Sequence, residues 1–72
     1  MPITSPGWAR CLDVLRRAPE DSFEHRLGDE LAAADRDQAL AVLVTIIDED
    51  PYGTTEYSTA AHMLRHWSEA TS

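Results

Sequence analysis

The sequence predicts an all-α protein, either a compact bundle of about four short helices or two stacked helical hairpins. Apolar residues recur at helical spacing in four stretches, and residues that commonly begin helices precede these stretches. No stretch is convincingly predicted as a strand, because a single apolar run would have no partner strand elsewhere in the chain. The 72 residues are expected to form one helical domain over residues 1–72. A chain of this length buries only about 60% of its unfolded surface, so it depends on good packing, a metal or a partner.

The first helix is predicted to begin at Ser5-Pro6, since serine is a favoured cap and proline fits the first helical position. One face of this helix is apolar and the other is charged. The apolar face consists of Trp8, Cys11, Leu12, Leu15 and Ala18, and the charged face of Arg10, Asp13, Arg16 and Arg17. Asp13 is expected to pair with the arginines three and four residues later. Cys11 is expected to face the core.

The second helix is predicted to follow Pro19, which ends the first. Acidic residues 20, 21 and 24 are expected in its first turn, where the helix dipole favours them. Phe23, Leu27 and Leu31 form a narrow apolar stripe, so this helix is expected at the periphery of the bundle. Gly28 interrupts it at a cost of about 1 kcal/mol relative to alanine.

The third helix is predicted within DRDQALAVLVTIIDED, residues 35–50. Asp35 and Gln38 have the spacing of a capping box. The apolar positions cover roughly 200° of the circumference, which is wider than an ordinary amphipathic stripe. This helix is therefore expected to be the central one, or to be partly buried by a second copy of the chain. The second possibility makes a homodimer or an obligate homo-oligomer the alternative organisation.

The last helix is predicted to follow PYG at residues 51–53, with Thr54 or Thr55 as its cap. Its inward face is expected to contain Tyr57, Ala60, Ala61, Leu64 and Trp67. The stretch QALAVLVTIIDEDP, followed by STAAHML, resembles one hairpin of a HEAT repeat, with an apolar helix, an acidic turn and an alanine-rich helix. This resemblance covers only the second half of the chain. It implies a helical hairpin and nothing about function.

The charge balance excludes some classes of function. The chain contains thirteen acidic residues and six arginines, which gives a net charge of −7. Direct nucleic-acid binding is not expected, because phosphate neutralisation needs clustered basic residues. No apolar run is long enough to span a membrane, and MPITSPGW has no signal-peptide pattern. We expect a cytoplasmic protein. The absence of lysine and asparagine indicates a GC-rich genome, and we expect a bacterial or phage source.

The acidic segment around residues 48–56 is the strongest candidate for a functional surface. We expect it to bind a basic surface on another protein, which would make the chain an inhibitor, immunity or adaptor protein. The partner-binding residues would be Asp48, Glu49, Asp50, Tyr52 and Glu56. The simpler alternative is that these charges are only solvated. The segment is not an EF-hand, because Tyr52 and Thr59 stand at calcium-ligand positions that they cannot fill.

Two histidines one helical turn apart, His62 and His66, raise the question of a metal site. Together with Glu69 they are an alternative set of zinc ligands. A durable site needs a further ligand, and His25 and Cys11 are expected to lie elsewhere. We therefore expect solvated histidines and no cofactor. No phosphate-binding loop, nucleophile elbow or acid–base pair is present in the sequence, so we expect a protein that is not an enzyme.

Overall fold

The computed structural model describes residues 5–71, which form four α-helices. They are α1 (Pro6–Arg16), α2 (Phe23–Ala33), α3 (Arg36–Glu49) and α4 (Thr55–Thr71). The all-α prediction is confirmed. Residues 1–4, the first half of the segment without a signal-peptide pattern, and residue 72 lie outside the described residues. Between residues 5 and 71, no helix combines the length and the apolar character needed to cross a membrane.

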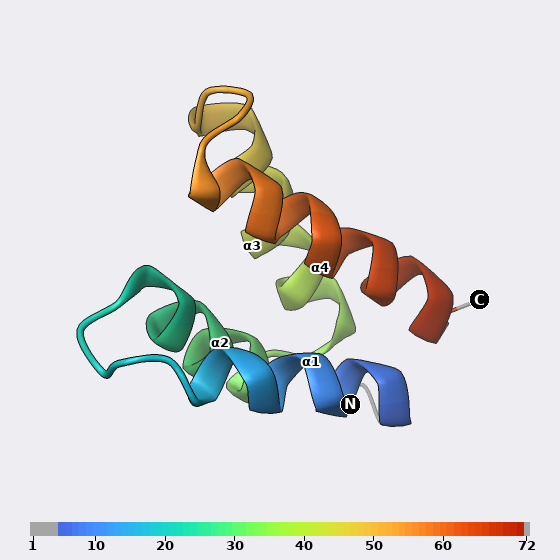
Figure 1. Cartoon of the computed structure of the whole chain (residues 1–72). Helices are drawn as coiled ribbons and strands as arrows, with labels where there is room; N and C mark the ends of the chain where they lie inside the picture. The colour runs from blue at the N-terminus through green and yellow to red at the C-terminus, as the bar shows by residue number, and fades with distance from the viewer. Residues whose placement is uncertain (1–4, 72) are drawn as a thin grey trace.

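The helices form two stacked hairpins (Figure 1). α1 packs chiefly on α2, and α3 packs chiefly on α4. The hairpins meet mainly where α1 lies against α4, and to a smaller extent where α2 lies against α3. The radius of gyration is 11.2 Å, which equals the value of about 11 Å for a compact domain of this length. The chain is therefore compact without a second copy.

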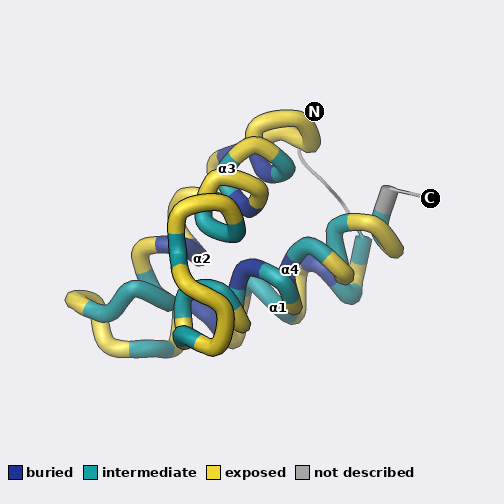
Figure 2. Tube along the Cα trace, turned by 90° about the horizontal axis from the view of Figure 1, so that it is seen from above, coloured by how far each residue is buried: buried dark blue, intermediate teal, exposed yellow. Residues whose placement is uncertain are grey.

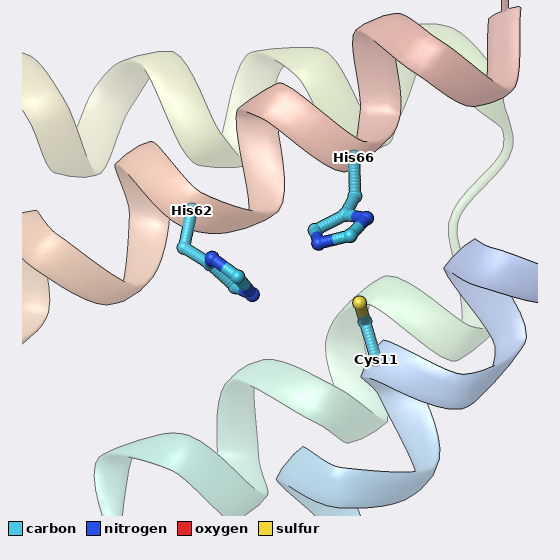
Figure 3. A group of neighbouring side chains, drawn as sticks. All are labelled: Cys11, His62 and His66. Carbon is cyan, nitrogen blue, oxygen red and sulfur yellow. The ribbon is translucent and has the colours of Figure 1, made fainter.

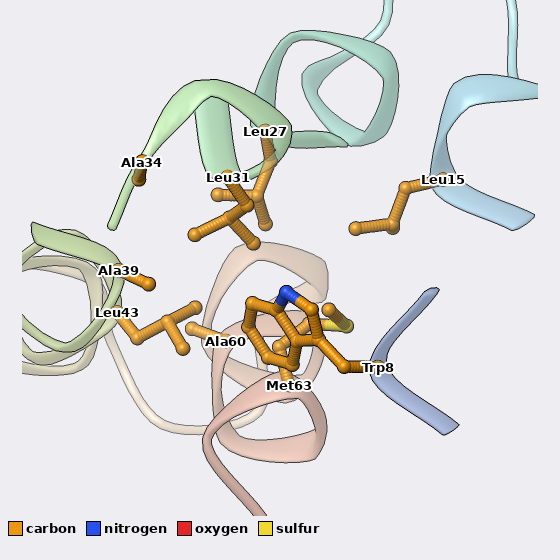
Figure 4. Close-up of a cluster of buried hydrophobic side chains, with 9 residues drawn as sticks. All are labelled: Trp8, Leu15, Leu27, Leu31, Ala34, Ala39, Leu43, Ala60 and Met63. Atoms are coloured by element: carbon orange, nitrogen blue, oxygen red, sulfur yellow. The ribbon is translucent and has the colours of Figure 1, made fainter. Parts of the chain in front are cut away.

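Side chains from all four helices meet in one core, and the buried positions follow the inner side of each helix (Figures 2 and 4). The buried apolar side chains are those of Trp8, Leu15, Leu27, Leu31, Ala34, Ala39, Leu43, Ala60 and Met63. The predicted inward face of α4 omitted Met63, which is only 1% exposed, and that omission was wrong. Of the five residues predicted on that face, only Ala60 is fully buried, and Tyr57, Ala61, Leu64 and Trp67 are partly buried. α4 contacts both α3 and α1, so its buried face is wider than a single stripe.

The predicted starts of the later helices are confirmed by hydrogen bonds. Gln38 N–H donates to Asp35 Oδ1 at 2.8 Å, and Asp35 N–H donates to Gln38 Oε1 at 3.4 Å, which completes the capping box. Thr54, rather than Thr55, caps α4, because its Oγ1 accepts the N–H of Tyr57 at 3.2 Å. At α1, Ser5 occupies the cap position, but its side chain makes no capping hydrogen bond.

The loop between α1 and α2 differs from the prediction. Ser22 caps α2 by accepting the N–H of His25 at 3.2 Å, so Glu20 and Asp21 precede the helix instead of loading its first turn. Glu24 is the acidic residue in that turn. The first turn of α2 therefore begins at Phe23, where the Ser22 side chain satisfies one of the amides that have no partner inside the helix.

Side chains of α2 fasten the carboxyl end of α1. Arg17 pairs with Asp13 at 2.7 Å as predicted, whereas Arg16 pairs with Asp29 of α2 at 3.2 Å. The Nδ1 of His25 lies 3.0 Å from the carbonyl oxygen of Arg16, to which it donates as the Nδ1–H tautomer. One of the last carbonyls of α1, a group without a partner inside its own helix, is thereby satisfied.

The two helices approach closely at Gly28, which is buried. A Cβ at this position would lie 2.9 Å from both Leu15 Cβ and Arg16 Cγ. The low helix propensity of glycine is thus offset by the close packing that it allows.

We predict that Gly28→Ala lowers the free energy of unfolding by about 1–3 kcal/mol, because the added methyl group overpacks the α1–α2 contact. Gly7→Ala is the matched control, since a Cβ there would meet only Ser5 Oγ, at 3.8 Å. The control should be neutral or gain up to about 1 kcal/mol. Urea unfolding followed by circular dichroism measures both. Equal stability of the two variants would contradict the close approach.

Candidate functional site

The turn between α3 and α4 exposes an aromatic ring among carboxylates. Tyr52 is 89% exposed. Its ring packs edge-to-face on Tyr57, with centroids 5.3 Å apart and an interplanar angle of 63°. We call Asp48, Glu49, Asp50, Tyr52 and Glu56 the acidic turn. Asp48 and Glu49 are exposed, and Asp50 and Glu56 are half-buried.

Hydrogen bonds close this turn. Thr54 donates from its backbone N–H and from Oγ1 to the carbonyl oxygen of Pro51, at 3.2 and 2.8 Å. Gly53 has a φ of +91°, a conformation that glycine adopts readily and other residues do not. The exposed ring of Tyr52 therefore projects from a turn with a defined backbone.

Two of the three consecutive acidic residues, Asp48 and Glu49, lie inside the last turn of α3. Glu49 is the last residue of the helix and Asp50 is its C-cap. Acids at this end oppose the helix dipole by about 0.3–1 kcal/mol each, and no basic residue lies in the last turn of α3. Within the described residues, no ion pair to Asp48, Glu49, Asp50 or Glu56 occurs. Helix stability thus does not account for this concentration of charge.

A second cluster joins the two hairpins. Ligand atoms of Cys11 on α1 and of His62 and His66 on α4 all lie within 4.8 Å of one another. In Figure 3 the sulfur of Cys11 points towards α4, and the two imidazole rings project towards α1. The prediction that no third ligand lies near the histidines is wrong. Cys11 is half-buried instead of enclosed in the core, because it lies at the edge of the α1–α4 contact.

The histidines differ in their surroundings. His62 is exposed as predicted, whereas the side chain of His66 is only 29% exposed. Their rings pack edge-to-face, with centroids 4.6 Å apart and an interplanar angle of 68°. Glu69 lies beside them, with Oε2 3.9 Å from Nδ1 of His66. It is outside the group of three whose ligand atoms converge.

An apolar groove between α2 and α3 was not predicted. It has a volume of about 510 Å³ and is lined by Phe23, Arg26, Leu27, Glu30, Ala41, Val42, Thr45 and Ile46. The sequence showed that α3 has a wide apolar face, but not which neighbour leaves part of it uncovered. Val42 and Ile46 remain half-buried, although Ala39 and Leu43 of the same helix are fully buried.

No protein-family model, curated protein or solved structure matches the chain. Its function must therefore be argued from the acidic turn, the cysteine–histidine cluster and the groove.

The environment of Cys11 predicts a shifted reactivity. Burial raises the pKa of its thiol, Arg10 lowers it, Glu69 raises it, and the net direction is upwards. Alkylation by iodoacetamide, which needs the thiolate, should therefore reach half of its maximal rate at a higher pH in the folded protein than in the urea-unfolded chain. Arg10→Gln should move the folded profile further up in pH, and Glu69→Gln should move it down. A folded profile at lower pH than the unfolded one would contradict this assignment.

Proposed function

We propose that this protein acts without catalysis, in the cytoplasm, by binding a basic surface of a partner protein through the acidic turn. The observation that carries the proposal is the 89% exposure of Tyr52 among carboxylates without ion pairs in the described part of the chain. Tyrosine is enriched among the residues that dominate binding energy at protein interfaces. A single cysteine and the absence of a disulfide framework fit a reducing compartment.

The chemistry of the acidic turn favours arginine on the partner. A guanidinium group stacks on an aromatic face and also pairs with carboxylates in a two-pronged geometry. Tyr52 offers the ring, and Asp48 and Glu49 offer exposed carboxylates four and three residues before it in the chain. Residues 37–72 contain six acids and one arginine, a net charge of −5, which would attract such a surface over a distance.

The defined backbone of the turn supports tight binding. A loop that is already ordered loses less conformational entropy when a partner binds. Thr54 closes the turn on Pro51, and Tyr57 lies against the ring of Tyr52, so both the backbone and the ring have partners before binding. An inhibitor, immunity protein or adaptor would use such a surface, and on a nucleic-acid-binding partner it would compete with phosphates for arginines.

We predict that removing the charge or the ring abolishes most of the binding. The immobilised protein is used to capture partners from a bacterial lysate, and the affinity for a captured, purified partner is then measured by calorimetry. Tyr52→Ala should weaken binding by about 10- to 30-fold, the effect of an interface residue worth roughly 1.4–2 kcal/mol. Asp48→Ser with Glu49→Ser should weaken it at low salt and flatten its salt dependence.

The matched control is Glu20→Ser with Asp21→Ser, which removes the same charge from exposed positions in the loop before α2. It should leave the affinity within a factor of two or so, because long-range screening leaves distant charges with little effect. Unchanged binding at low salt by the variant of Asp48 and Glu49 would refute the proposal. Equal weakening by both double variants would show that binding depends on the net charge of the protein and not on the acidic turn.

The groove between α2 and α3 favours a second candidate function, self-association. Its floor is apolar, and its lining includes one basic and one acidic side chain from α2, Arg26 and Glu30. Both are exposed, and neither forms an ion pair within residues 5–71. In a two-fold symmetric dimer the same surface meets itself, and an axis that passes between Arg26 and Glu30 would place Arg26 of one copy opposite Glu30 of the other.

We predict a reversible dimer that depends on this charge pairing. Arg26→Glu places like charges across the dyad and should shift the sedimentation coefficient towards the monomer at every concentration. The exchanged variant, Arg26→Glu with Glu30→Arg, restores opposite charges and should restore the dimer. Sedimentation velocity over a range of protein concentrations measures both, with circular dichroism as the check on folding. A folded monomer at all micromolar concentrations would refute the dimer and also the obligate oligomer.

A further inference from the structure

The cysteine–histidine cluster brings together three metal-ligating side chains that the sequence separates by about fifty residues. His62 and His66 lie on one face of α4 at one-turn spacing, and Cys11 faces them from α1. One thiol and two imidazoles are the donor types that zinc prefers in proteins. None of these three residues belongs to the acidic turn or lines the groove. The arrangement is therefore independent of the proposed partner binding.

We propose that Cys11, His62 and His66 bind a transition-metal ion of the zinc class, which would join α1 to α4. Zinc–sulfur and zinc–nitrogen bonds of about 2.3 and 2.0–2.1 Å place tetrahedral ligands roughly 3.3–3.7 Å apart. The three ligand atoms already lie within 4.8 Å of one another. Rotation of the exposed His62 and the half-buried Cys11 and His66 supplies the remaining approach without a change in the helices.

Glu69 lies close enough to the cluster to supply a fourth ligand. Three protein ligands leave one tetrahedral position for water or for another oxygen donor. Glu69 lies one turn beyond His66 with Oε2 3.9 Å from its Nδ1. A small rotation would let this carboxylate fill the fourth position, or accept the ring proton of His66 and orient it, as carboxylates do beside metal-bound histidines.

The thiol must lose its proton when the metal binds. Burial raises the pKa of Cys11, which favours the thiol in the metal-free protein. A divalent zinc ion reverses this preference, because a coordinating thiol is deprotonated by the charge of the ion. Binding is therefore accompanied by the release of a proton from sulfur, and the Zn²⁺–thiolate bond replaces the S–H bond.

A metal ion bound by these residues would link the two hairpins. Cys11 belongs to the α1–α2 hairpin, and both histidines belong to the α3–α4 hairpin. A ligand that binds only the folded chain stabilises it in proportion to the logarithm of its concentration over its dissociation constant. A domain of this size has a small hydrophobic core, so a metal link between its hairpins would contribute a large share of its stability.

The test is a titration of the metal-free full chain with Co²⁺ and Zn²⁺, followed by absorbance and calorimetry. One equivalent of Co²⁺ should give the visible bands of a tetrahedral ion and a thiolate-to-cobalt charge-transfer band in the near ultraviolet, and Zn²⁺ should displace it. Saturating zinc should raise Tm by about 10 °C or more at a hundredfold excess over the dissociation constant. The variant of Asp48 and Glu49 should behave like the wild type, so failure here is distinguishable from failure of the partner-binding proposal.

Three variants decide which side chains bind the ion. Cys11→Ser should abolish the charge-transfer band, and His62→Ala and His66→Ala should each weaken binding by at least about tenfold. His62 is exposed, so its variant should keep the fold even where the others lose stability. Binding of equal affinity in Cys11→Ser would overturn the site in favour of a two-histidine surface contact. Half an equivalent of metal per chain, with dimer formation that survives Cys11→Ser, or no tetrahedral cobalt spectrum at all, would overturn it as well.

Discussion

The contact between α1 and α4 is the constraint on which the rest of the molecule depends. Each hairpin is formed by neighbours in sequence, but the core closes only where one hairpin lies on the other, and α1 against α4 is the larger of their two contacts. Trp8, from the first turns of α1, is 2% exposed in the core that also contains Met63 of α4. Burying an aromatic side chain of this size contributes about 2–3 kcal/mol, a large share of the stability of so small a domain. One turn after Trp8 along α1, the same contact brings Cys11 to the histidines.

The sequence predicted what depends on neighbours along the chain. The capping box of Asp35 and Gln38 and the cap at Thr54 were readable because each needs only residues three apart. The acidic turn could be identified from the sequence because its five residues lie within nine positions of one another. Met63 was missed because its burial depends on α4 packing against two helices at once, and a single-stripe pattern describes packing against one. Gly28 was assigned a cost without its reason, since the nearness of Leu15 across the hairpin has no signature in local sequence.

The cysteine–histidine cluster shows the same limit for function. The one-turn spacing of His62 and His66 identified two ligands, and Cys11 was set aside as a core residue because it lies on the apolar face of α1. Cys11 does lie on the apolar face of α1, but it is only half-buried instead of enclosed in the core. A residue at the edge of an apolar face contacts whatever lies at the margin of the facing helix, and here the margin of α4 is polar. Only the angle and register of two helices distant in sequence decide this, and spacing along one helix contains neither.

The acidic turn lies at the end of α3 and in the loop before α4, with only Glu56 on α4 itself, whereas His62 and His66 lie further along that helix of 17 residues and about 25 Å. The turn is fixed at the amino end by Thr54 and by the ring of Tyr57, and these contacts involve neither α1 nor the histidines. A metal at the cluster would therefore strengthen the junction of the hairpins without reshaping the acidic turn. It would, however, reduce movement of α3 and α4 as a unit against α2, and the groove between α2 and α3 is formed across that same junction. The proposed metal would therefore affect the proposed self-association more directly than the acidic turn, because the groove depends on how the hairpins stack and the acidic turn depends only on the loop within one hairpin.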